Sequence, residues 1–248
     1  MTFFSSVRVV FSLLLIAALS TPAVVGAAGV EERIRRILSE QVPQLRVTDV
    51  RPTELDGIHE VRTNQDTLYM SADGGHAVVG TLLRFDEAQG IVNLTEQGRA
   101  AERKKKLSQL KTEDMIAFSP AAETKATLYV FTDINCGYCR KLHRNMQAMN
   151  EMGIRVNYLS FPRGGPGSEG HRKAIATWCA DNPRETMTRA KRGESIPDAE
   201  CDHPVNEQYQ LGRAMGVSGT PAIVFEDGRM IPGFRPPEAL ADLLDLSS

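Results

Sequence analysis

The chain carries little net charge and, beyond its first residues, no long run of apolar side chains. Its 248 residues include 29 Lys and Arg against 31 Asp and Glu, which gives a formal net charge of −2. Nucleic-acid-binding domains are usually basic, so this balance argues against that class. No segment reaches the roughly 20 consecutive apolar residues of a membrane-spanning helix, and no repeat or low-complexity tract is evident. Hydrophobic residues still make up 42% of the chain, enough for a folded core.

The first residues have the pattern of a secretory signal. Arg8 is the only charge in this leader, and an apolar run follows at residues 9–19. Pro22 and a series of small residues up to Ala28 then end the run. This order of charged, apolar and small-residue regions predicts a signal peptide at residues 1–27, cleaved near Ala27 or Ala28, and an exported mature protein. A retained membrane anchor is the alternative, which the short run disfavours.

The length suits two domains, and residues 28–94 read as a small α+β domain. Val30, Ile34 and Leu38 are spaced as on an amphipathic helix. Strands are expected at residues 58–63, 67–71, 76–85 and 91–94, with a hairpin turn at 73–75. By pattern alone, the strand at 76–85 is an ordinary internal strand rather than an edge that pairs with a second copy.

The second part of the chain reads as a helix followed by an α/β domain. Thr95 can cap a basic helix that runs to about Leu110, which we interpret as a solvated linker rather than a phosphate or lipid site. Pro120 marks the domain boundary. Later elements are expected as a strand at 127–132, a helix at 136–152, a strand at 154–161, two or three helices within 171–215, strands at 222–225 and 230–231, and a terminal helix from 237. The order βαβ, helical insert, ββα predicts a thioredoxin-type fold.

Cysteine is scarce, and all four cysteines lie in the second half of the chain. Cys136 and Cys139 form a C-x-x-C motif where a strand meets a helix, which is typical of a redox pair. A helix N-terminus favours negative charge, so the Cys136 thiol is expected to ionise below its free pKa and to act as the nucleophile. We expect Cys139, one turn later, to be less exposed and to act second. Gly137 and Tyr138 between them tune the redox equilibrium of the pair.

Neighbouring residues complete this prediction. Arg140 and Lys141 add positive charge but are expected to point to solvent, and His143 is read as a surface or packing residue rather than a catalytic base. A zinc site is one alternative for the C-x-x-C motif, although it lacks two further ligands at short spacing. A structural staple is another, although the loop that it closes is very short. No metal is therefore expected.

Cys179 and Cys201 are expected to bond to each other, since an even number of cysteines in an exported protein usually pairs. Closing a loop of this length stabilises a fold by about 3 kcal/mol in the chain-entropy model. A second redox pair is the alternative, but neither residue has a C-x-x-C environment. An X-Pro bond is trans by default, but Pro221, which follows Thr220 directly before a strand and lies roughly eighty residues beyond the C-x-x-C motif, resembles the cis-proline that faces the active disulfide in thioredoxin-type folds. The resemblance implies a cis bond here. The backbone at Thr220 and Pro221 would then bind an extended substrate.

These residues resemble the DsbC/DsbG family of periplasmic disulfide isomerases. The resemblance covers essentially the whole mature chain. It is most specific at residues 131–142 (FTDINCGYCRKL), 158–163 (YLSFPR), 178–180 (WCA) and 216–221 (GVSGTP). Glycine at position 137 resembles the DsbC branch, whereas DsbG carries a proline between its cysteines. Thr220, directly before Pro221, also fits the family. Only the glycine-rich loop at 168–170 departs from the pattern.

The resemblance implies a domain organisation and partners. It implies an N-terminal dimerisation domain at residues 28–94, a linker helix at 95–118 and a thioredoxin-like catalytic domain with a helical insertion at 119–248. The family forms V-shaped homodimers, which makes the region of Val78, Val79 and Gly80 the expected dimer interface and replaces the internal-strand interpretation. It also implies a periplasmic location, an inner-membrane reductant of the DsbD type, misoxidised exported proteins as substrates, and no cofactor.

The expected function is a disulfide isomerase in which Cys136 attacks wrong disulfides of exported proteins, with room for a chaperone activity beside it. Two other functions stay open at this point. A holdase chaperone would bind unfolded chains without essential redox chemistry, and a net oxidant would hold the pair Cys136 and Cys139 oxidised.

Overall fold

A computed structural model of the chain describes residues 27–246, which form two compact units. The first unit comprises the described residues up to Thr63 together with Leu68–Val78. The second unit comprises Asn64–Thr67 and the described residues from Val79 onward. The expected signal peptide at 1–27 lies outside the described residues apart from Ala27, where the first helix begins. None of the described helices has the length and apolar character needed to cross a membrane.

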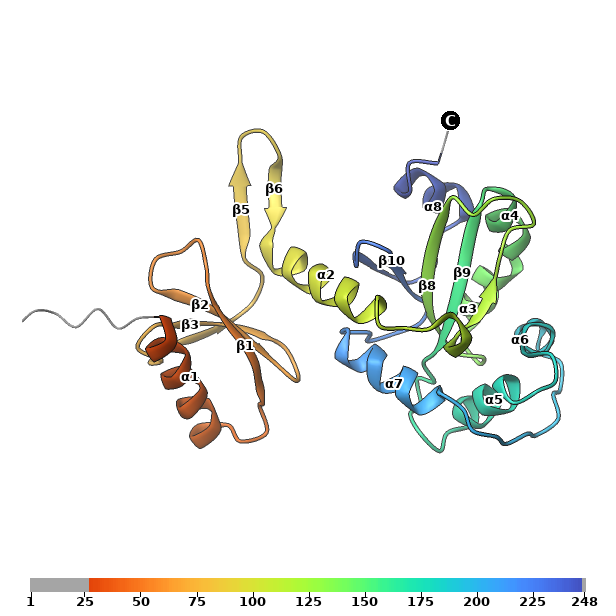
Figure 1. The fold of residues 1–248 in the computed structure, drawn as a ribbon, viewed down its shortest axis with the longest axis horizontal. Coiled ribbons are helices and arrows are strands. Elements are labelled where there is room, and N and C mark those ends of the chain that lie inside the picture. The colour runs from red at the N-terminus through yellow and green to blue at the C-terminus, as the bar shows by residue number, and fades with distance from the viewer. Residues whose placement is uncertain (1–26, 247–248) are drawn as a thin grey trace, which may run out of the picture. The chain divides into compact units, whose positions relative to one another are not determined.

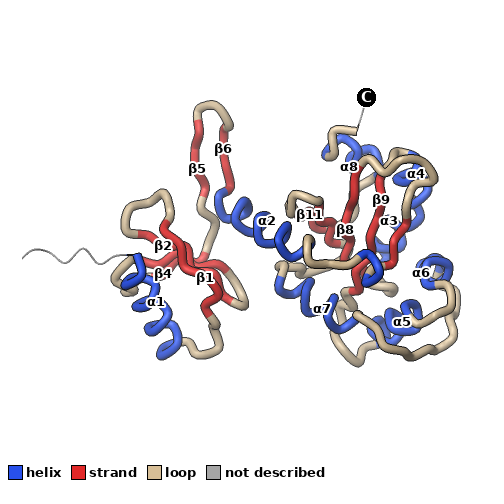
Figure 2. The backbone as a smooth tube through the Cα atoms, viewed as in Figure 1, coloured by secondary structure: helices blue, strands red, loops and turns tan. Residues whose placement is uncertain are grey.

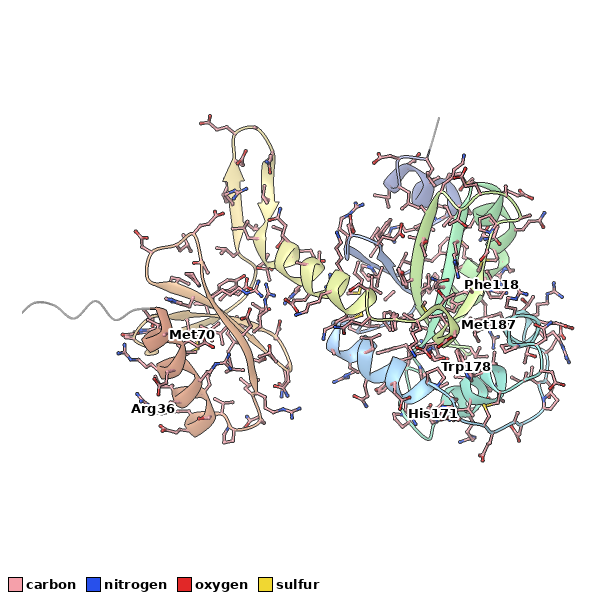
Figure 3. The ribbon with its side chains drawn as sticks, in the orientation of Figure 1. Arg36, Met70, Phe118, His171, Trp178 and Met187 are labelled. Atoms are coloured by element: carbon pink, nitrogen blue, oxygen red, sulfur yellow. A yellow bond between two sulfur atoms is a disulfide. The ribbon has the colours of Figure 1, made fainter. Side chains whose placement is uncertain are left out.

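The N-terminal elements form one helix packed on one sheet. The helix and the strands, in chain order, are α1 (Ala27–Gln41), β1 (Val47–Pro52), β2 (Ile58–Thr63), β3 (Thr67–Ser71) and β4 (Ala77–Val79). The strands are neighbours in the order β1-β2-β3-β4, so β4 lies at an edge. The apolar face of α1, with Ile34 at its centre, packs against Val61 and Met70 of the sheet (Figure 3).

The expected strand at 76–85 is interrupted in the structure. It divides into β4 and, after residues 80–82, β5 (Leu83–Asp86), which pairs antiparallel with β6 (Gly90–Asn93) in a separate hairpin. Gly80 begins this break, and a glycine weakens the interior of a strand because it has no side chain to pack. β6 leads directly into helix α2 (Leu94–Leu107) (Figure 2). The cap of this helix is the side chain of Asn93 rather than the expected Thr95.

The rest of the chain builds the thioredoxin-like domain around a five-stranded sheet. The strands, in the spatial order β11-β10-β8-β9-β7, are β11 (Met230–Pro232), β10 (Ala222–Phe225), β8 (Ala126–Thr132), β9 (Ile154–Ser160) and β7 (Ile116–Phe118). β8 and β9 run parallel through the middle of this domain (Figure 1), and the other pairs are antiparallel. β7 occupies residues that were assigned to the linker helix, because pairing with β9 recruits a segment too short to show a strand pattern.

The helices of this domain cover both faces of the sheet. They are α3 (Gly137–Arg144), α4 (Met146–Glu151), α5 (Glu169–Trp178), α6 (Pro183–Arg192), α7 (Val205–Ala214) and α8 (Pro237–Leu243), together with a 3-10 turn at Thr112–Asp114. Successive residues of a strand point to opposite faces of the sheet, so each face has its own hydrophobic core. Val130 packs with Met187 and Phe118 on one face (Figure 3), and Phe131 packs with Phe161 on the other. The single helix expected at 136–152 is two helices that meet at Asn145.

Candidate active site

The sheet order brings the C-x-x-C motif and the proline loop together. β10 runs antiparallel to β8 with Ala222 opposite Phe131, so the segment before β10 lies beside the segment after β8. The segment after β8 leads to Cys136, the N-cap of α3. The segment before β10 contains the Thr220–Pro221 peptide bond, which is cis as expected. As a result, the Cys136 thiol donates a hydrogen bond to the carbonyl oxygen of Thr220, at 3.2 Å.

The two cysteines differ little in exposure. Cys136 is 2% exposed and Cys139 is fully buried, and both are free thiols. Cys139 is less exposed than Cys136, as expected, but Cys136 is itself more buried than a nucleophile on the surface would be. Gly137 and Tyr138 are exposed above them, and a side chain at Gly137 would meet open space. Cys136 Sγ thus lies between this exposed turn and the Thr220 carbonyl group.

The surroundings of Cys136 favour its thiolate. Burial raises the pKa of the Cys136 thiol, but the Thr220 side chain and Cys139, which can donate hydrogen bonds to the thiolate, and the positive charge of Arg163 outweigh that effect. The pKa consequently lies below its ordinary value. The backbone N–H of Cys139 is one of the free donors of the first helical turn, which explains how the α3 N-terminus stabilises the anion.

The surroundings of Cys139 have the opposite net effect. Burial raises the pKa of the Cys139 thiol, and this effect exceeds the lowering by Lys191, by the Asp133 backbone and by the side chains of Thr132 and Thr220. The environments therefore separate the pKa values of the two thiols, so that Cys136 is the more acidic and Cys139 the less acidic of the pair. This difference in acidity suits a pair in which the first thiol attacks a disulfide and the second reacts only after a mixed disulfide has formed.

Thr220 contributes its side chain as well as its carbonyl group. Its hydroxyl oxygen is buried and has no conventional hydrogen-bond partner within residues 27–246. It lies near both sulfurs and lowers the pKa of each. The carbonyl of Thr220 can accept only from the protonated Cys136 thiol, whereas the hydroxyl can donate to the thiolate. Pro221, the other half of this loop, is buried directly before β10.

Sequence reasoning missed an ion pair that frames the motif. The carboxylate of Asp133 is 5% exposed and accepts hydrogen bonds from the backbone N–H groups of Asn135 and Arg163. Arg163 Nε also donates to Asp133 Oδ2 at 3.0 Å. The pair connects the turn before the C-x-x-C motif to the loop after β9, and it holds the Arg163 charge near Cys136. The proximity of both residues to recognised motifs was the available signal.

A second missed feature is the buried polar cluster below Cys139. Lys191 on α6 is 3% exposed, and its Nζ donates to Thr132 Oγ1 at 2.7 Å and to the Asp133 carbonyl oxygen at 2.9 Å. His143 is also buried, between the Tyr158 hydroxyl at 3.2 Å and Thr188 Oγ1 at 3.0 Å. Burial lowers the pKa of His143 to about 4, with help from Lys191 and Arg192. A neutral, enclosed His143 agrees with packing and not with surface exposure.

The charged residues beside the motif differ in their exposure. Arg140 is half-buried, and its Nε donates to the Ile134 carbonyl oxygen at 3.1 Å, so the expectation that it points to solvent is wrong. Lys141 is exposed and lies over the ring of Phe234, with 4.5 Å from its Nζ to the ring centroid. Neither charge interacts directly with a sulfur in the way that Arg163 and Lys191 do.

The structure also describes the remaining predicted residues. Cys179 and Cys201 form a disulfide that joins the end of α5 to the segment before α7 across 22 positions. Val78 and Val79 are 64% and 67% exposed on the edge strand β4, and Gly80 follows them.

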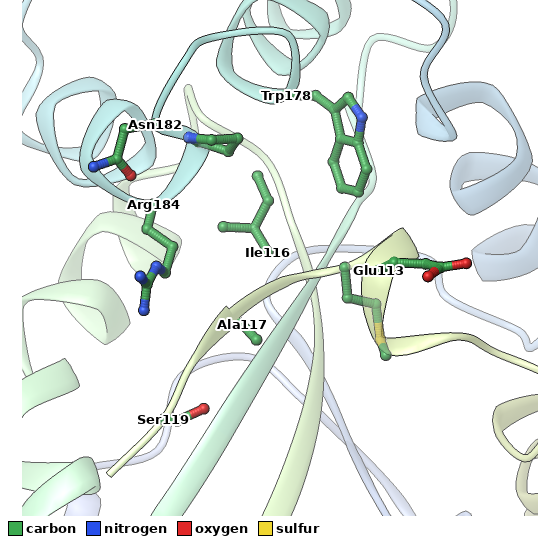
Figure 4. Close-up of a pocket in the computed structure, with 9 residues that line it drawn as sticks. Glu113, Ile116, Ala117, Ser119, Trp178, Asn182 and Arg184 are labelled. Carbon is green, nitrogen blue, oxygen red and sulfur yellow. The ribbon is translucent and has the colours of Figure 1, made fainter. Parts of the chain in front are cut away.

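A surface pocket of about 500 Å³ also lies apart from the cysteines (Figure 4). It is lined by Glu113, Met115, Ile116, Ala117, Ser119, Trp178, Asn182, Pro183 and Arg184. Neither sulfur contributes to this pocket, and its residues include no pair of acid–base or nucleophilic groups.

Comparison with known proteins agrees with both parts of the fold. Residues 25–96 match the model of the disulfide bond isomerase protein N-terminal domain, and residues 113–247 match that of the thioredoxin-like domain. The thiol:disulfide interchange protein DsbC of Escherichia coli K12 is 36% identical over 81% of this chain and 82% of its own length. DsbC of Dickeya dadantii is 34% identical over 96% of this chain and 94% of its own.

Among solved structures, Proteus mirabilis ScsC in a transitional conformation superposes with a TM-score of 0.50 at 18% identity. The match covers 60% of this chain and 79% of that chain. At this identity the likeness concerns the fold alone.

Proposed function

Because the chain belongs to the DsbC family of thiol:disulfide interchange proteins, which are disulfide isomerases, we propose that Cys136 and Cys139 are its reactive pair and that it reshuffles wrong disulfides in exported proteins. One observation carries this assignment: a free thiol with a lowered pKa stands at the N-terminus of α3, in hydrogen-bond contact with the Thr220 loop. Thiolate is the attacking species in disulfide exchange, so this arrangement supplies the nucleophile at neutral pH.

The first chemical step is attack by the Cys136 thiolate on a substrate disulfide. The new bond joins Cys136 to one substrate sulfur, and the other substrate sulfur leaves as a thiolate. The backbone at Thr220 and Pro221 holds the extended substrate chain, since this loop borders the attacking sulfur. The exposed residues Gly137 and Tyr138 form the opposite border and tune the equilibrium of the pair.

The mixed disulfide can then be resolved in two ways. Another substrate thiolate attacks and releases Cys136 with a new substrate pairing, which is isomerisation without net oxidation. Alternatively, Cys139 attacks Cys136, which releases a reduced substrate and leaves the enzyme oxidised. An external reductant of the DsbD type, at the inner membrane, then restores the dithiol. The raised pKa of Cys139 keeps this second route slower than the first attack.

Location and assembly follow from the same assignment. The leader at 1–27 sends the protein to the periplasm, where disulfides persist in exported proteins. Two copies associate through the edge strand β4, where Val78 and Val79 expose apolar side chains next to Gly80. An edge strand with unpaired backbone groups and apolar side chains is a template for pairing with a second strand of the same kind.

A chaperone activity is the second candidate function. The large apolar side chains of Phe85 and Ile91, paired across the β5–β6 hairpin, are 78% and 66% exposed. Exposed apolar surface of this kind can bind unfolded chains. A Cys136→Ala/Cys139→Ala double variant that still suppresses aggregation would separate this activity from catalysis.

The test of the proposed function is refolding of a scrambled multi-disulfide protein in a redox buffer. Cys136→Ala is expected to abolish catalysed recovery of activity. Cys139→Ala is expected to accumulate mixed disulfides that survive non-reducing electrophoresis. Full isomerase activity of the Cys136→Ala variant would refute the assignment, and isolation of the protein from the periplasm with the pair oxidised would favour a net oxidant.

A further inference from the structure

Lys191 occupies a position that a lysine rarely tolerates. α6 turns Met187, Ala190 and Lys191 to the protein interior, at the spacing of one helical face. Burial of an ammonium group is costly unless hydrogen bonds and charges compensate it. Among the described residues Lys191 forms no ion pair with a carboxylate, and its two hydrogen bonds go to Thr132 and to the backbone of Asp133. Packing alone does not explain a lysine here, since an apolar side chain would fill the same space.

Thr132 connects Lys191 to the resolving thiol. Its hydroxyl oxygen accepts from Lys191 Nζ at 2.7 Å, and the Thr132 side chain is also one of the groups that lower the pKa of the Cys139 thiol, because its hydroxyl can donate to the Cys139 thiolate. A hydroxyl group can accept from one neighbour and donate to another at the same time. The sequence Cys139 Sγ, Thr132 Oγ1, Lys191 Nζ is therefore a continuous path for a proton.

The surroundings of Lys191 bring its pKa close to neutral pH. Burial lowers the pKa of Lys191 to about 8, although Cys139, Asp133 and Cys136 act to raise it, and Arg140 lowers it further. The other groups that face it are His143, whose own pKa is lowered by the Lys191 charge, and the ring of Tyr158, 5.8 Å from Nζ. A lysine with a pKa of about 8 is partly neutral near pH 7 and can accept a proton, whereas an exposed lysine, with a pKa of about 10.4, stays protonated.

We propose that Lys191 accepts the proton of Cys139, through the Thr132 hydroxyl, when Cys139 resolves the mixed disulfide. This inference rests on the proposed roles of the two cysteines. The Thr132 hydroxyl passes its proton to the neutral amine of Lys191 and takes the proton of the Cys139 thiol. The Cys139 thiolate then forms a bond with Cys136 Sγ while the bond from Cys136 to the substrate breaks, and the substrate leaves as a thiolate. Lys191 acts through Thr132 and is thus a positioning residue for the proton.

The test measures resolution separately from the first attack. Reaction of the reduced protein with 5,5′-dithiobis(2-nitrobenzoate) places a thionitrobenzoate on Cys136, and the attack by Cys139 releases it as a coloured thiolate. Stopped-flow traces over a range of pH give the rate of each stage. In the wild type the release rate is expected to rise through an inflection near the Lys191 pKa of about 8.

Lys191→Met and Lys191→Arg separate a proton acceptor from a fixed charge. Both variants are expected to lose the inflection and to release thionitrobenzoate at least about tenfold more slowly at pH 7, while the first attack stays within about twofold of the wild type. A wild-type profile in Lys191→Arg would assign Lys191 a purely electrostatic role and overturn the proposal, as would a wild-type profile in Lys191→Met.

The threonine provides an independent pair of variants in case the lysine variants fail to fold. Thr132→Val is expected to slow release as the lysine variants do, and Thr132→Ser, which keeps the hydroxyl, is expected to retain the wild-type profile. Equal pH profiles of the release rate for Thr132→Val and Thr132→Ser would overturn the proposed proton transfer through the Thr132 hydroxyl. Failure of the proposed function looks different, because the adduct would then not form on Cys136 at all.

Discussion

The sulfur of Cys136 lies 3.2 Å from the carbonyl oxygen of Thr220, a residue 84 positions later in the chain. Antiparallel pairing of β8 with β10 produces this contact, because it places the segments at the adjoining ends of the two strands side by side. The same arrangement directs the Thr220 hydroxyl toward both thiols. The nucleophile and the loop assigned to substrate binding are thus two parts of one structure.

Removal of the Thr220 hydroxyl should make Cys136 less acidic. Thr220→Val deletes a group that lowers the pKa of Cys136, so the pKa should rise and the rate of alkylation at pH 7 should fall severalfold. Thr177→Val is the matched control, since Thr177 also has a buried hydroxyl oxygen with no partner among residues 27–246. Equal alkylation rates for Thr220→Val and the wild type would show that the hydroxyl does not act on the sulfur.

The stability of the protein should fall in mild acid because of His143. Burial lowers the pKa of this histidine from 6.5 to about 4. Between these values the unfolded chain binds a proton that the folded chain does not, so the free energy of unfolding decreases as the pH falls from 6.5 to 4. The full loss is on the order of 3 kcal/mol.

Urea denaturation at several pH values measures this dependence. His143→Gln should flatten the curve over this range, whereas His76→Gln, at an exposed histidine, should leave it as in the wild type. An unchanged slope in His143→Gln would assign the acid sensitivity to other groups.

The disulfide of Cys179 and Cys201 should contribute stability and no catalysis. Replacement of both by alanine removes a cross-link over 22 positions and should lower the free energy of unfolding by about 2–4 kcal/mol. Replacement of both avoids a free thiol that could react with Cys136. Urea titration measures the loss, and isomerase assays at low temperature should give wild-type turnover. A variant that is fully folded but inactive would instead support a second redox pair.

A charge on the edge strand β4 should prevent association of two copies. Val79 is 67% exposed there, and Val79→Asp would place two carboxylates in the proposed symmetric interface, which should weaken the dimer at least about a hundredfold. Leu55→Asp is the matched control, because Leu55 is 51% exposed but lies outside β4. Light scattering during gel filtration should give a monomer for the first variant and a dimer for the second. A dimer in both would place the interface elsewhere.

Much of the fold followed from local sequence pattern. The strands at Ile58–Thr63, Thr67–Ser71 and Ala222–Phe225 have the expected bounds, since turn residues flank short runs of strand-forming residues. Three helices fill the insert between residues 171 and 215, as expected. The short edge strand Ile116–Phe118 was missed, because only its partner β9 defines it as a strand.

The site residues that belong to a local sequence motif could be predicted from the sequence. The C-x-x-C spacing predicted a pair at Cys136 and Cys139, both of which are free thiols at the start of a helix, and the resemblance of Pro221 to the cis-proline of thioredoxin-type folds predicted the cis bond. Lys191 could not be found in this way, because a lysine on an amphipathic helix is normally solvent-exposed and only tertiary packing buries it. The same holds for the pairing of Asp133 with Arg163, which depends on two loops that meet in space.

The acidity of the Cys136 thiol is the property on which the account depends most directly. The rate of iodoacetamide alkylation, measured from pH 4 to 10 with mass spectrometry to identify the modified residue, reports it. We expect Cys136 to be modified first, with an inflection below the value of about 8.5 for a free cysteine. An inflection at or above that value, or modification of Cys139 before Cys136, would contradict the account.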